Sequence, residues 1–155
     1  MKLTRTLEVT EKEFYDYLEQ DLIEKIFKTT GKQIKPAAIK KGLKYTLRPE
    51  DPMTRINVTI KSYERNQHYH AIIESYSETI VLRYETQRVP KGLDVTLTQS
   101  IESFESQKHN KLMQMFSEAV YLGRMTDMLY DIQSKIVKNR ELLEEQAQDL
   151  VATRK

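Results

Sequence analysis

The sequence predicts an α+β domain in which an antiparallel sheet of about six strands covers one face of a long C-terminal helix. From His109 to Asn139, apolar residues recur every three or four positions, which places them on one face of an α-helix. Between Leu43 and Ser103, apolar and polar residues alternate in short segments separated by turns, which is typical of antiparallel strands with one buried face. A helix of roughly thirty residues is about 45 Å long, and we expect the sheet to supply the broad surface that it needs.

The composition is that of one globular domain without disulfides. The chain has 155 residues and no cysteine, so it is long enough to bury a core and has no thiolate zinc site or cysteine nucleophile. Its net charge of +2 is too balanced for a dedicated nucleic-acid binder. No apolar run approaches the ~20 residues of a membrane span, and the N-terminus lacks the apolar core of a signal peptide. We therefore expect a cytoplasmic protein.

The N-terminal elements are a half-buried strand and a capped helix. Residues Lys2 to Val9 alternate in polarity, and Arg5 falls on the apolar face. We interpret Arg5 as a residue at the edge of the core, whose stem packs while its charge reaches water; the alternative is a cation that meets an acidic ligand. Thr10 and Glu13 form a capping box for the helix that follows, and we expect that helix to end at Thr30-Gly31.

The segment from Lys25 to Arg48 is the strongest compositional anomaly. It carries eight basic residues and no acidic one: Lys25, Lys28, Lys32, Lys35, Lys40, Lys41, Lys44 and Arg48. The favoured interpretation is a solvated face balanced by carboxylates elsewhere in the fold. The alternative is a contact surface for phosphate, an acidic lipid surface or an acidic partner. Residues Pro36 to Lys41 fit a short helix within this segment.

The central part of the chain fits a meander of five strands. The expected strands are Leu43–Leu47, Arg55–Tyr63, His68–Tyr76, a segment from about Glu78 to Glu85, and Leu93–Ser103. Turns are predicted at Arg65-Asn66-Gln67 and Pro90-Lys91-Gly92. Each strand has one apolar and one polar face, so we expect the sheet to be covered on one side only, by the two helices.

The residues that carry chemistry form no catalytic or metal-binding pattern. His68, His70 and Glu74 share one face of a strand, but a metal site would need a third converging ligand near the histidines, and their face is expected to meet solvent. There is no Gly-x-Ser-x-Gly motif, and the four glycines are too far apart to cradle a phosphate. We therefore predict no cofactor, no metal and no catalytic residue.

The C-terminal part of the chain raises two further expectations. Residues 140–155 are highly charged and helical in propensity, and we treat them as a frayed tail outside a domain of residues 1–139. Leu142, Leu143 and Leu150 would allow this tail to form a homodimer contact. Gly123 lies inside the predicted helix and costs about 1 kcal/mol of helix propensity, which predicts that close packing requires it.

The order of elements resembles the helix-grip fold of the START and Bet v 1-like (SRPBCC) superfamily. The stretches Met1–Val9, Thr30-Gly31-Lys32 and Gly42-Leu43-Lys44-Tyr45 resemble a small family of uncharacterised cytoplasmic proteins from Gram-positive bacteria. This resemblance implies a curved antiparallel sheet wrapped around the last helix, often with a hydrophobic cavity between them. Members of the wider superfamily bind lipids, polyketides or hormones, some cyclise or hydrolyse, and some regulate other proteins. The resemblance transfers no catalytic residue.

Methionine and tyrosine on the helix and sheet suit a cavity for an apolar or amphipathic small molecule, although core packing alone explains the same residues. The predicted ligand-binding residues are Arg5, Leu82, Tyr84, Leu97, Gln99, Met115, Leu122 and Met125. Tyr84 and Gln99 would orient a polar end of the ligand. The main alternative is a protein-interaction or regulatory module that uses Lys25–Arg48 or the tail. A third is an enzyme of cyclase or hydrolase type in the same cavity.

Overall fold

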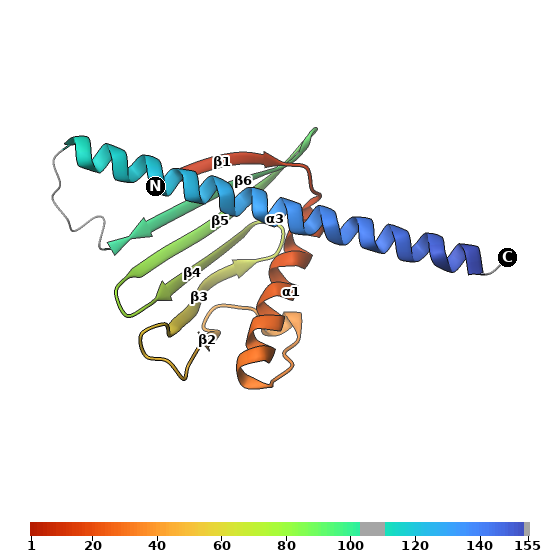
Figure 1. Ribbon diagram of the computed structural model, residues 1–155, viewed down its shortest axis with the longest axis horizontal. Helices are drawn as coiled ribbons and strands as arrows, with labels where there is room; N and C mark the ends of the chain where they lie inside the picture. The colour runs from red at the N-terminus through yellow and green to blue at the C-terminus, as the bar shows by residue number, and fades with distance from the viewer. Residues whose placement is uncertain (103–110, 154–155) are drawn as a thin grey trace.

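The computed structural model describes residues 1–102 and 111–153, which form one antiparallel sheet and two long helices (Figure 1). The strands run in the spatial order β1-β6-β5-β4-β3-β2. The elements are β1 (Lys2–Leu7), α1 (Glu11–Thr30), the 3₁₀ turn η1 (Pro36–Ala38), β2 (Lys44–Leu47), β3 (Ile56–Glu64), β4 (His68–Glu74), β5 (Thr79–Val89), β6 (Gly92–Ile101) and α3 (Lys111–Thr153). The predicted α+β class, the antiparallel sheet and the long C-terminal helix are confirmed.

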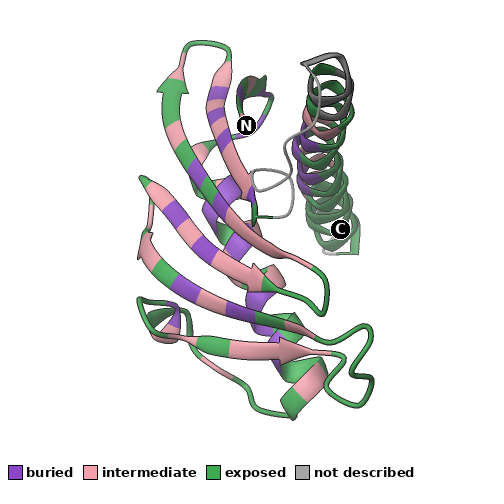
Figure 2. Ribbon diagram, turned by 90° about the vertical axis from the view of Figure 1, so that its left-hand side faces the viewer, coloured by how far each residue is buried: buried purple, intermediate pink, exposed green. Residues whose placement is uncertain are grey.

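The sheet is curved and both helices lie on one of its sides (Figure 2). Strands β2 to β6 follow one another as a meander, and β1 pairs with β6 to complete the sheet. The register places Leu3 opposite Leu97, Leu97 opposite Tyr84, and Tyr84 opposite Tyr69. These side chains share the face toward the helices, and all four are buried in the core. The alternation of polarity therefore identified the covered face correctly.

Local signals fix the first helix as the sequence predicts. The Thr10 side chain accepts a hydrogen bond from the Glu13 amide, and the Glu13 carboxylate accepts one from the Thr10 amide. Gly31 ends the helix with φ of 73°, in the left-handed region, and its amide donates to the Phe27 carbonyl. Phe14 and Tyr15 on the inner face of α1 are fully buried. This helix therefore seals one end of the sheet.

Helix α3 is held across the sheet edge by contacts with β1 and the start of α1. Among the α3 residues whose side chains are described, Met125, Leu129, Ile132 and Ile136 are buried. The Arg140 guanidinium donates to both carboxylate oxygens of Glu13, at 2.7 and 2.9 Å, and to the Glu8 carbonyl at 3.1 Å. Gln133 accepts a hydrogen bond from the Glu8 amide at 2.7 Å. The capping carboxylate of α1 thus also anchors α3.

Three expectations about α3 need correction. The helix does not end near Asn139 but continues to Thr153, and the side chains of residues 141–153 are exposed. The packing role expected for Gly123 is wrong, because this residue is exposed and an added Cβ would meet no atom within 4 Å. Met115 is also 67% exposed, so it does not belong to the buried stripe of the helix.

We expect Gly123→Ala to stabilise the protein by about 0.5–1 kcal/mol, because alanine favours the helix and fits here without a clash. Urea unfolding measures the change. Gly92→Ala is the matched comparison: Gly92 has φ of 148°, and a Cβ there would clash with the Leu7 carbonyl of the neighbouring strand. It should destabilise by at least about 1 kcal/mol. Loss of stability in Gly123→Ala would contradict the exposed position.

We expect the contact between Glu13 and Arg140 to make stability depend on acid pH. The Arg140 hydrogen bonds lower the pKa of Glu13 from 4.5 to about 2. Because the folded-state pKa is depressed, the stabilisation is present above about pH 4.5 and is lost as pH falls toward 2. Arg140→Leu should cost about 1–2 kcal/mol near neutral pH, since Arg140 is partly exposed, and less at the acid end.

Urea unfolding across this pH range tests the prediction. Lys12→Ala removes an ion pair with Asp16 in which the lysine side chain is 80% exposed, so it serves as the control. Its effect should stay below about 0.5 kcal/mol. An equal cost for Arg140→Leu at both ends of the pH range would contradict the assigned role of Glu13.

Candidate functional site

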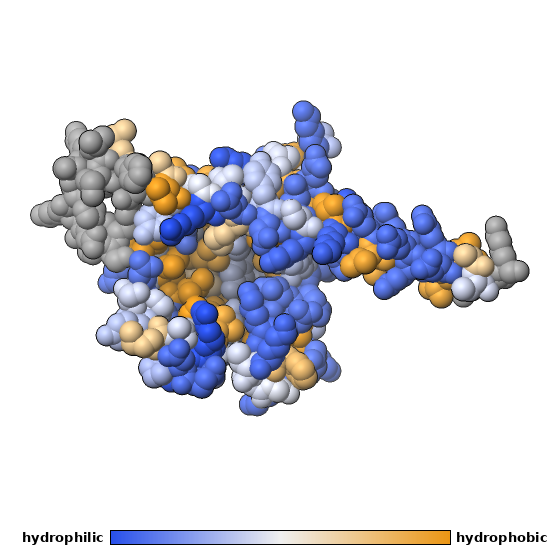
Figure 3. Space-filling model, viewed as in Figure 1, coloured by the Kyte–Doolittle hydropathy of each residue, from blue (hydrophilic) through white to orange (hydrophobic). Residues whose placement is uncertain are grey.

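The inner face of the sheet is covered unevenly. Helix α1 packs its aromatic rings on one end of the sheet, where the centroids of Phe14 and Tyr84 lie 6.0 Å apart. In the described part of the chain, α3 approaches β1 and α1 closely rather than the central strands. The inward-facing Ile56, Ile73 and Ile80, on β3, β4 and β5, are accordingly only half-buried. Figure 3 shows a recessed apolar surface beneath α3.

Tyrosine side chains bring polar groups into this apolar interior. Tyr45, Tyr69 and Tyr84 project from β2, β4 and β5, and the rings of Tyr69 and Tyr84 lie 6.2 Å apart. The interaction with Tyr69 adds to burial in raising the pKa of Tyr45. Tyr17 reaches the same region from α1 and contacts the Lys135 side chain of α3. We call Tyr17, Tyr45, Tyr69 and Tyr84 the hydroxyl cluster.

The hydroxyl of Tyr84 has no hydrogen-bond partner among the described residues, although the residue is only 5% exposed. No described polar side-chain atom is both fully buried and unpartnered. The Tyr84 hydroxyl is therefore a polar group in the apolar interior without a hydrogen-bond partner among the described residues. The side-chain amide of Gln99, half-buried on β6, likewise makes no hydrogen bond within the described part of the chain.

The electrostatics keep the hydroxyl cluster neutral. Burial is the main cause that raises the pKa of each of the four tyrosines, and for Tyr69 the raised pKa is about 12. The Asp21 carboxylate on α1 raises the pKa of all four tyrosines further. Neutral phenols both donate and accept hydrogen bonds. The cluster therefore suits a polar group that carries no full charge.

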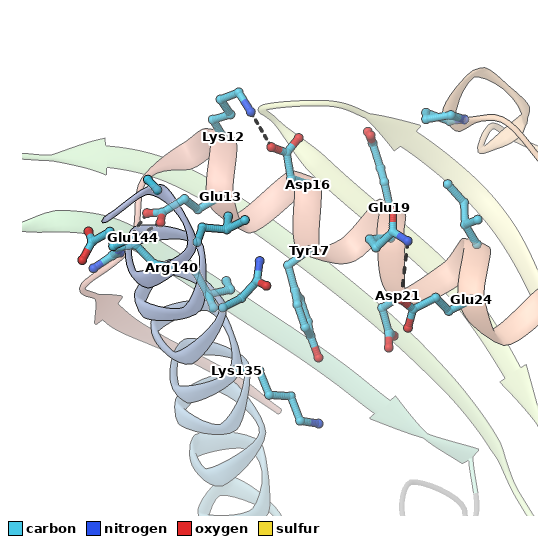
Figure 4. Close-up of a pocket in the computed structure, with 17 residues that line it drawn as sticks. Lys12, Glu13, Asp16, Tyr17, Glu19, Asp21, Glu24, Lys135, Arg140 and Glu144 are labelled. Atoms are coloured by element: carbon cyan, nitrogen blue, oxygen red, sulfur yellow. Dashed lines mark hydrogen bonds and ion pairs between the residues drawn. The ribbon is translucent and has the colours of Figure 1, made fainter. Parts of the chain in front are cut away.

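A groove of about 830 Å³ runs between α1 and the C-terminal half of α3 and adjoins the cluster (Figure 4). Tyr17 and Asp21 extend from α1 toward the same side of it, and Lys135 approaches Tyr17 from α3. The Glu13–Arg140 contact closes one part of the groove. Apolar residues of its lining are Ile23, Pro36, Ile136, Leu143 and Ala147.

The predicted ligand-binding residues differ in how deeply they are buried and in what they contact. Leu82, Tyr84, Leu97 and Met125 are buried in one cluster, Leu122 packs against that cluster, and Gln99 is half-buried beside Leu82 in the strand register. The Arg5 guanidinium contacts the Thr4 carbonyl at 2.9 Å and the Thr126 hydroxyl at 3.4 Å. Met115 is 67% exposed.

Sequence reasoning missed Tyr17, Asp21 and Lys135. These residues lie on α1 and α3, and only the crossing of the two helices brings them to the hydroxyl cluster. The helical positions of Tyr17 and Asp21, four residues apart, were the available signal, because such residues share one face of a helix.

The other candidate groups have local partners. His68 Nε2 lies 2.6 Å from the Ser62 hydroxyl, and His70 Nδ1 lies 3.4 Å from the Arg83 guanidinium. Across residues 1–102 and 111–153, no three or more metal-ligating side chains come together. In the same ranges, Lys25 is the one residue of the basic segment that forms an ion pair, with Asp21 at 2.8 Å. None of the described helices is long and apolar enough to cross a membrane.

The curved sheet, the long helix across it and the recessed apolar face define an α+β domain of the helix-grip class. More particularly, the chain belongs to the family described as "Domain of unknown function (DUF3284)", whose model matches residues 1–122. No curated protein matches the sequence.

Solved structures share this fold at low sequence identity. A protein of unknown function from Staphylococcus aureus, SA2116, has a TM-score of 0.58 and 16% identity over 90% of this chain and 93% of its own. Ara h 8.0201, a Bet v 1-like protein, has a TM-score of 0.57 and 9% identity, with 89% and 97% covered. Protein MLL2253 from Mesorhizobium loti has a TM-score of 0.57 and 12% identity, with 90% and 96% covered. These similarities concern the fold alone.

We expect the hydroxyl cluster to limit stability at alkaline pH. Because the folded-state pKa of each tyrosine is raised, the neutral cluster stabilises the fold below about pH 10 and this contribution is lost as pH rises above it. Tyr84→Phe keeps the ring and removes a hydroxyl without a partner, so it should reduce the alkaline loss at little cost near neutral pH. Urea unfolding as a function of pH, with tyrosinate absorbance, measures both. An unchanged alkaline loss in Tyr84→Phe would contradict the buried neutral phenol.

Proposed function

We propose that this protein binds a small amphipathic molecule between the sheet and α3. The apolar part of the ligand lies on the half-covered inner face of β3, β4 and β5, and its polar group meets the hydroxyl cluster. The observation that carries this proposal is the Tyr84 hydroxyl, which is enclosed in an apolar core and has no hydrogen-bond partner among the described residues. An unpaired polar group in such a place costs free energy unless a ligand or water satisfies it.

The chemistry of the lining favours an uncharged polar group. The raised pKa values of Tyr45, Tyr69 and Tyr84 keep these side chains protonated near neutral pH, so they offer hydroxyl donors and acceptors rather than anions. A carbonyl or hydroxyl of the ligand is the natural complement. Gln99 supplies an amide with donor and acceptor groups from the neighbouring part of the sheet. Arg5 would face an acidic ligand only after leaving Thr126, which it contacts at 3.4 Å.

The apolar contacts come from residues that packing leaves incomplete. Ile73 and Ile80 on the sheet and Leu122 on α3 are half-buried, whereas Leu82, Leu97 and Met125 are already buried behind them. Removing the exposed part of such side chains from water would contribute about 25 cal/mol per Å² of apolar area. A ligand that covers this surface therefore gains affinity without any charged contact.

The two alternative functions have unequal support. An enzyme would need an acid or base in this interior, whereas the phenols that line it are held neutral. A protein-interaction role has a specific observation in its favour: exposed leucines on the part of α3 that leaves the domain. That surface lies apart from the proposed ligand site and does not compete with it.

Native mass spectrometry of the freshly purified protein, repeated under denaturing conditions, tests the proposal directly. We expect a surplus mass that disappears on denaturation. For protein stripped of any bound molecule, the neutral apolar fluorophore N-phenylnaphthylamine is the probe, and we expect saturable binding with increased fluorescence.

Ile73→Trp and Ile72→Trp form a matched pair for this probe. These neighbours on β4 point to opposite faces of the sheet, Ile73 inward and Ile72 outward. Ile73→Trp should fill the site and reduce probe binding at least about ten-fold, a difference of 1.4 kcal/mol. Ile72→Trp should leave binding unchanged. A clean mass without surplus, together with no probe binding, or equal effects of the two substitutions, would contradict the proposal.

A further inference from the structure

The last part of α3, residues 141–153, leaves the domain as an exposed helix (Figure 1). We call these residues the extension. At 1.5 Å per residue it is about 20 Å long. A helix of this length is marginal in water by itself, since most helical stability in proteins comes from the packing of an apolar face. The extension nevertheless exposes Leu143, Leu150 and Val151 by 58%, 63% and 61%.

The exposed leucines continue the face by which α3 grips its own sheet. Leu122, Leu129, Ile136, Leu143 and Leu150 follow one another at intervals of seven residues, so they lie along one side of the helix. Leu129 and Ile136 are buried, at 0% and 5% exposed, whereas the next two positions are in solvent. The same apolar stripe is therefore covered in one half and uncovered in the other.

Charge indicates what covers the extension. It carries Glu141, Glu144, Glu145 and Asp149 and no basic residue. The connection between α1 and β2 has the opposite character, with exposed lysines and no acidic residue: Lys32, Lys35, Lys40 and Lys41. Within the described residues, neither set forms an ion pair. Pro36 and Leu143 both line the groove between α1 and α3, so the two charged segments border the same groove.

We propose that this protein forms a symmetric dimer in which each extension lies in the groove between α1 and α3 of a second copy. The two α3 helices run antiparallel, with the twofold axis near Leu143. Leu150 of one copy then packs near Ile136 of the other, which lines the groove. The acidic side of each extension meets the basic connection of the other copy, and the contact closes on itself as an isologous interface.

Most of the α1 carboxylates that line the groove have an intramolecular cation, whereas Glu24 accepts a hydrogen bond from the Gln20 amide at 3.4 Å and has no ion pair among the described residues. Glu13 is paired with Arg140 at 2.7 Å, Asp16 with Lys12 at 2.6 Å and Asp21 with Lys25 at 2.8 Å. Glu19 contacts Arg65 at 3.0 Å. The basic connection reaches the groove at Pro36 and carries lysines without an ion pair among the described residues, whose sign is the one that an acidic helix requires.

The area to be buried favours the groove over a simple pairing of the two extensions. One face of a helix about 20 Å long and 10 Å wide offers a footprint of only about 200 Å². A stable interface buries about 800 Å² on each partner. Entry into a groove of about 830 Å³ lets each extension contact α1 and α3 of the other copy along its length.

Sedimentation velocity of the full chain over a range of concentrations tests the proposal. We expect a dimer for the wild type and a monomer for Leu143→Glu/Leu150→Glu, with at least about 100-fold weaker association. Leu142→Glu is the matched control, because Leu142 is 49% exposed but lies about 100° away around the helix and does not line the groove. This control should remain dimeric, and far-ultraviolet circular dichroism confirms that all variants fold.

A charge exchange tests the contact between the extension and the basic connection. Lys32→Glu/Lys35→Glu should weaken the dimer at least about five-fold, and adding Glu144→Lys/Asp149→Lys in the same chain should restore it. A wild type that stays monomeric at all concentrations, or a dimer that survives Leu143→Glu/Leu150→Glu, would overturn the proposal. So would a monomer that co-purifies with a different protein held by the same leucines.

Discussion

The position of α3 along the edge strand β1 is the constraint on which the rest of the structure depends. β1 lies at the start of the sequence and pairs with β6, so that Lys2 stands opposite Thr98. The N-terminal amine of Met1 donates a hydrogen bond to the Gln99 carbonyl at 2.9 Å. α3 then packs on this edge, and Arg140 and Gln133 bind it to the β1–α1 connection. One carboxylate, that of Glu13, serves both the cap of α1 and the anchor of α3. The two helices and the sheet edge are therefore fixed as one unit.

This arrangement leaves the inner face of the central strands incompletely covered. A helix placed directly over β4 and β5 would bury their aliphatic residues and the tyrosine hydroxyls with them. Because α3 lies toward β1, Ile73 and Ile80 remain half-buried. The proposed ligand site would thus be a consequence of how the helix is anchored.

The same helix connects the proposed ligand site with the proposed dimer contact. Met125 and Leu129 face the core, Ile136 lines the groove, and Leu143 and Leu150 lie in solvent, all on one continuous helix. Lys135 contacts the hydroxyl cluster through Tyr17 and borders the groove. A change in the position of α3 on ligand binding would therefore alter the groove that receives the second copy.

The sequence by itself determined the local structure: the capping box, the left-handed Gly31, the strands of the meander and the face that each strand buries. These features depend on neighbouring residues and on periods of two and 3.6, which a sequence displays directly. The prediction that Leu82, Tyr84, Leu97 and Met125 line a ligand cavity stays a prediction, and in the structure all four are buried in the core. Only the tertiary structure decided what covers each apolar stripe. It placed Met115 and Gly123 in solvent, extended α3 to Thr153 and brought Tyr17, Asp21 and Lys135 to the strand tyrosines. Periodicity shows which face of a helix is apolar, but the crossing of two helices depends on contacts between residues more than a hundred positions apart, which no local pattern records.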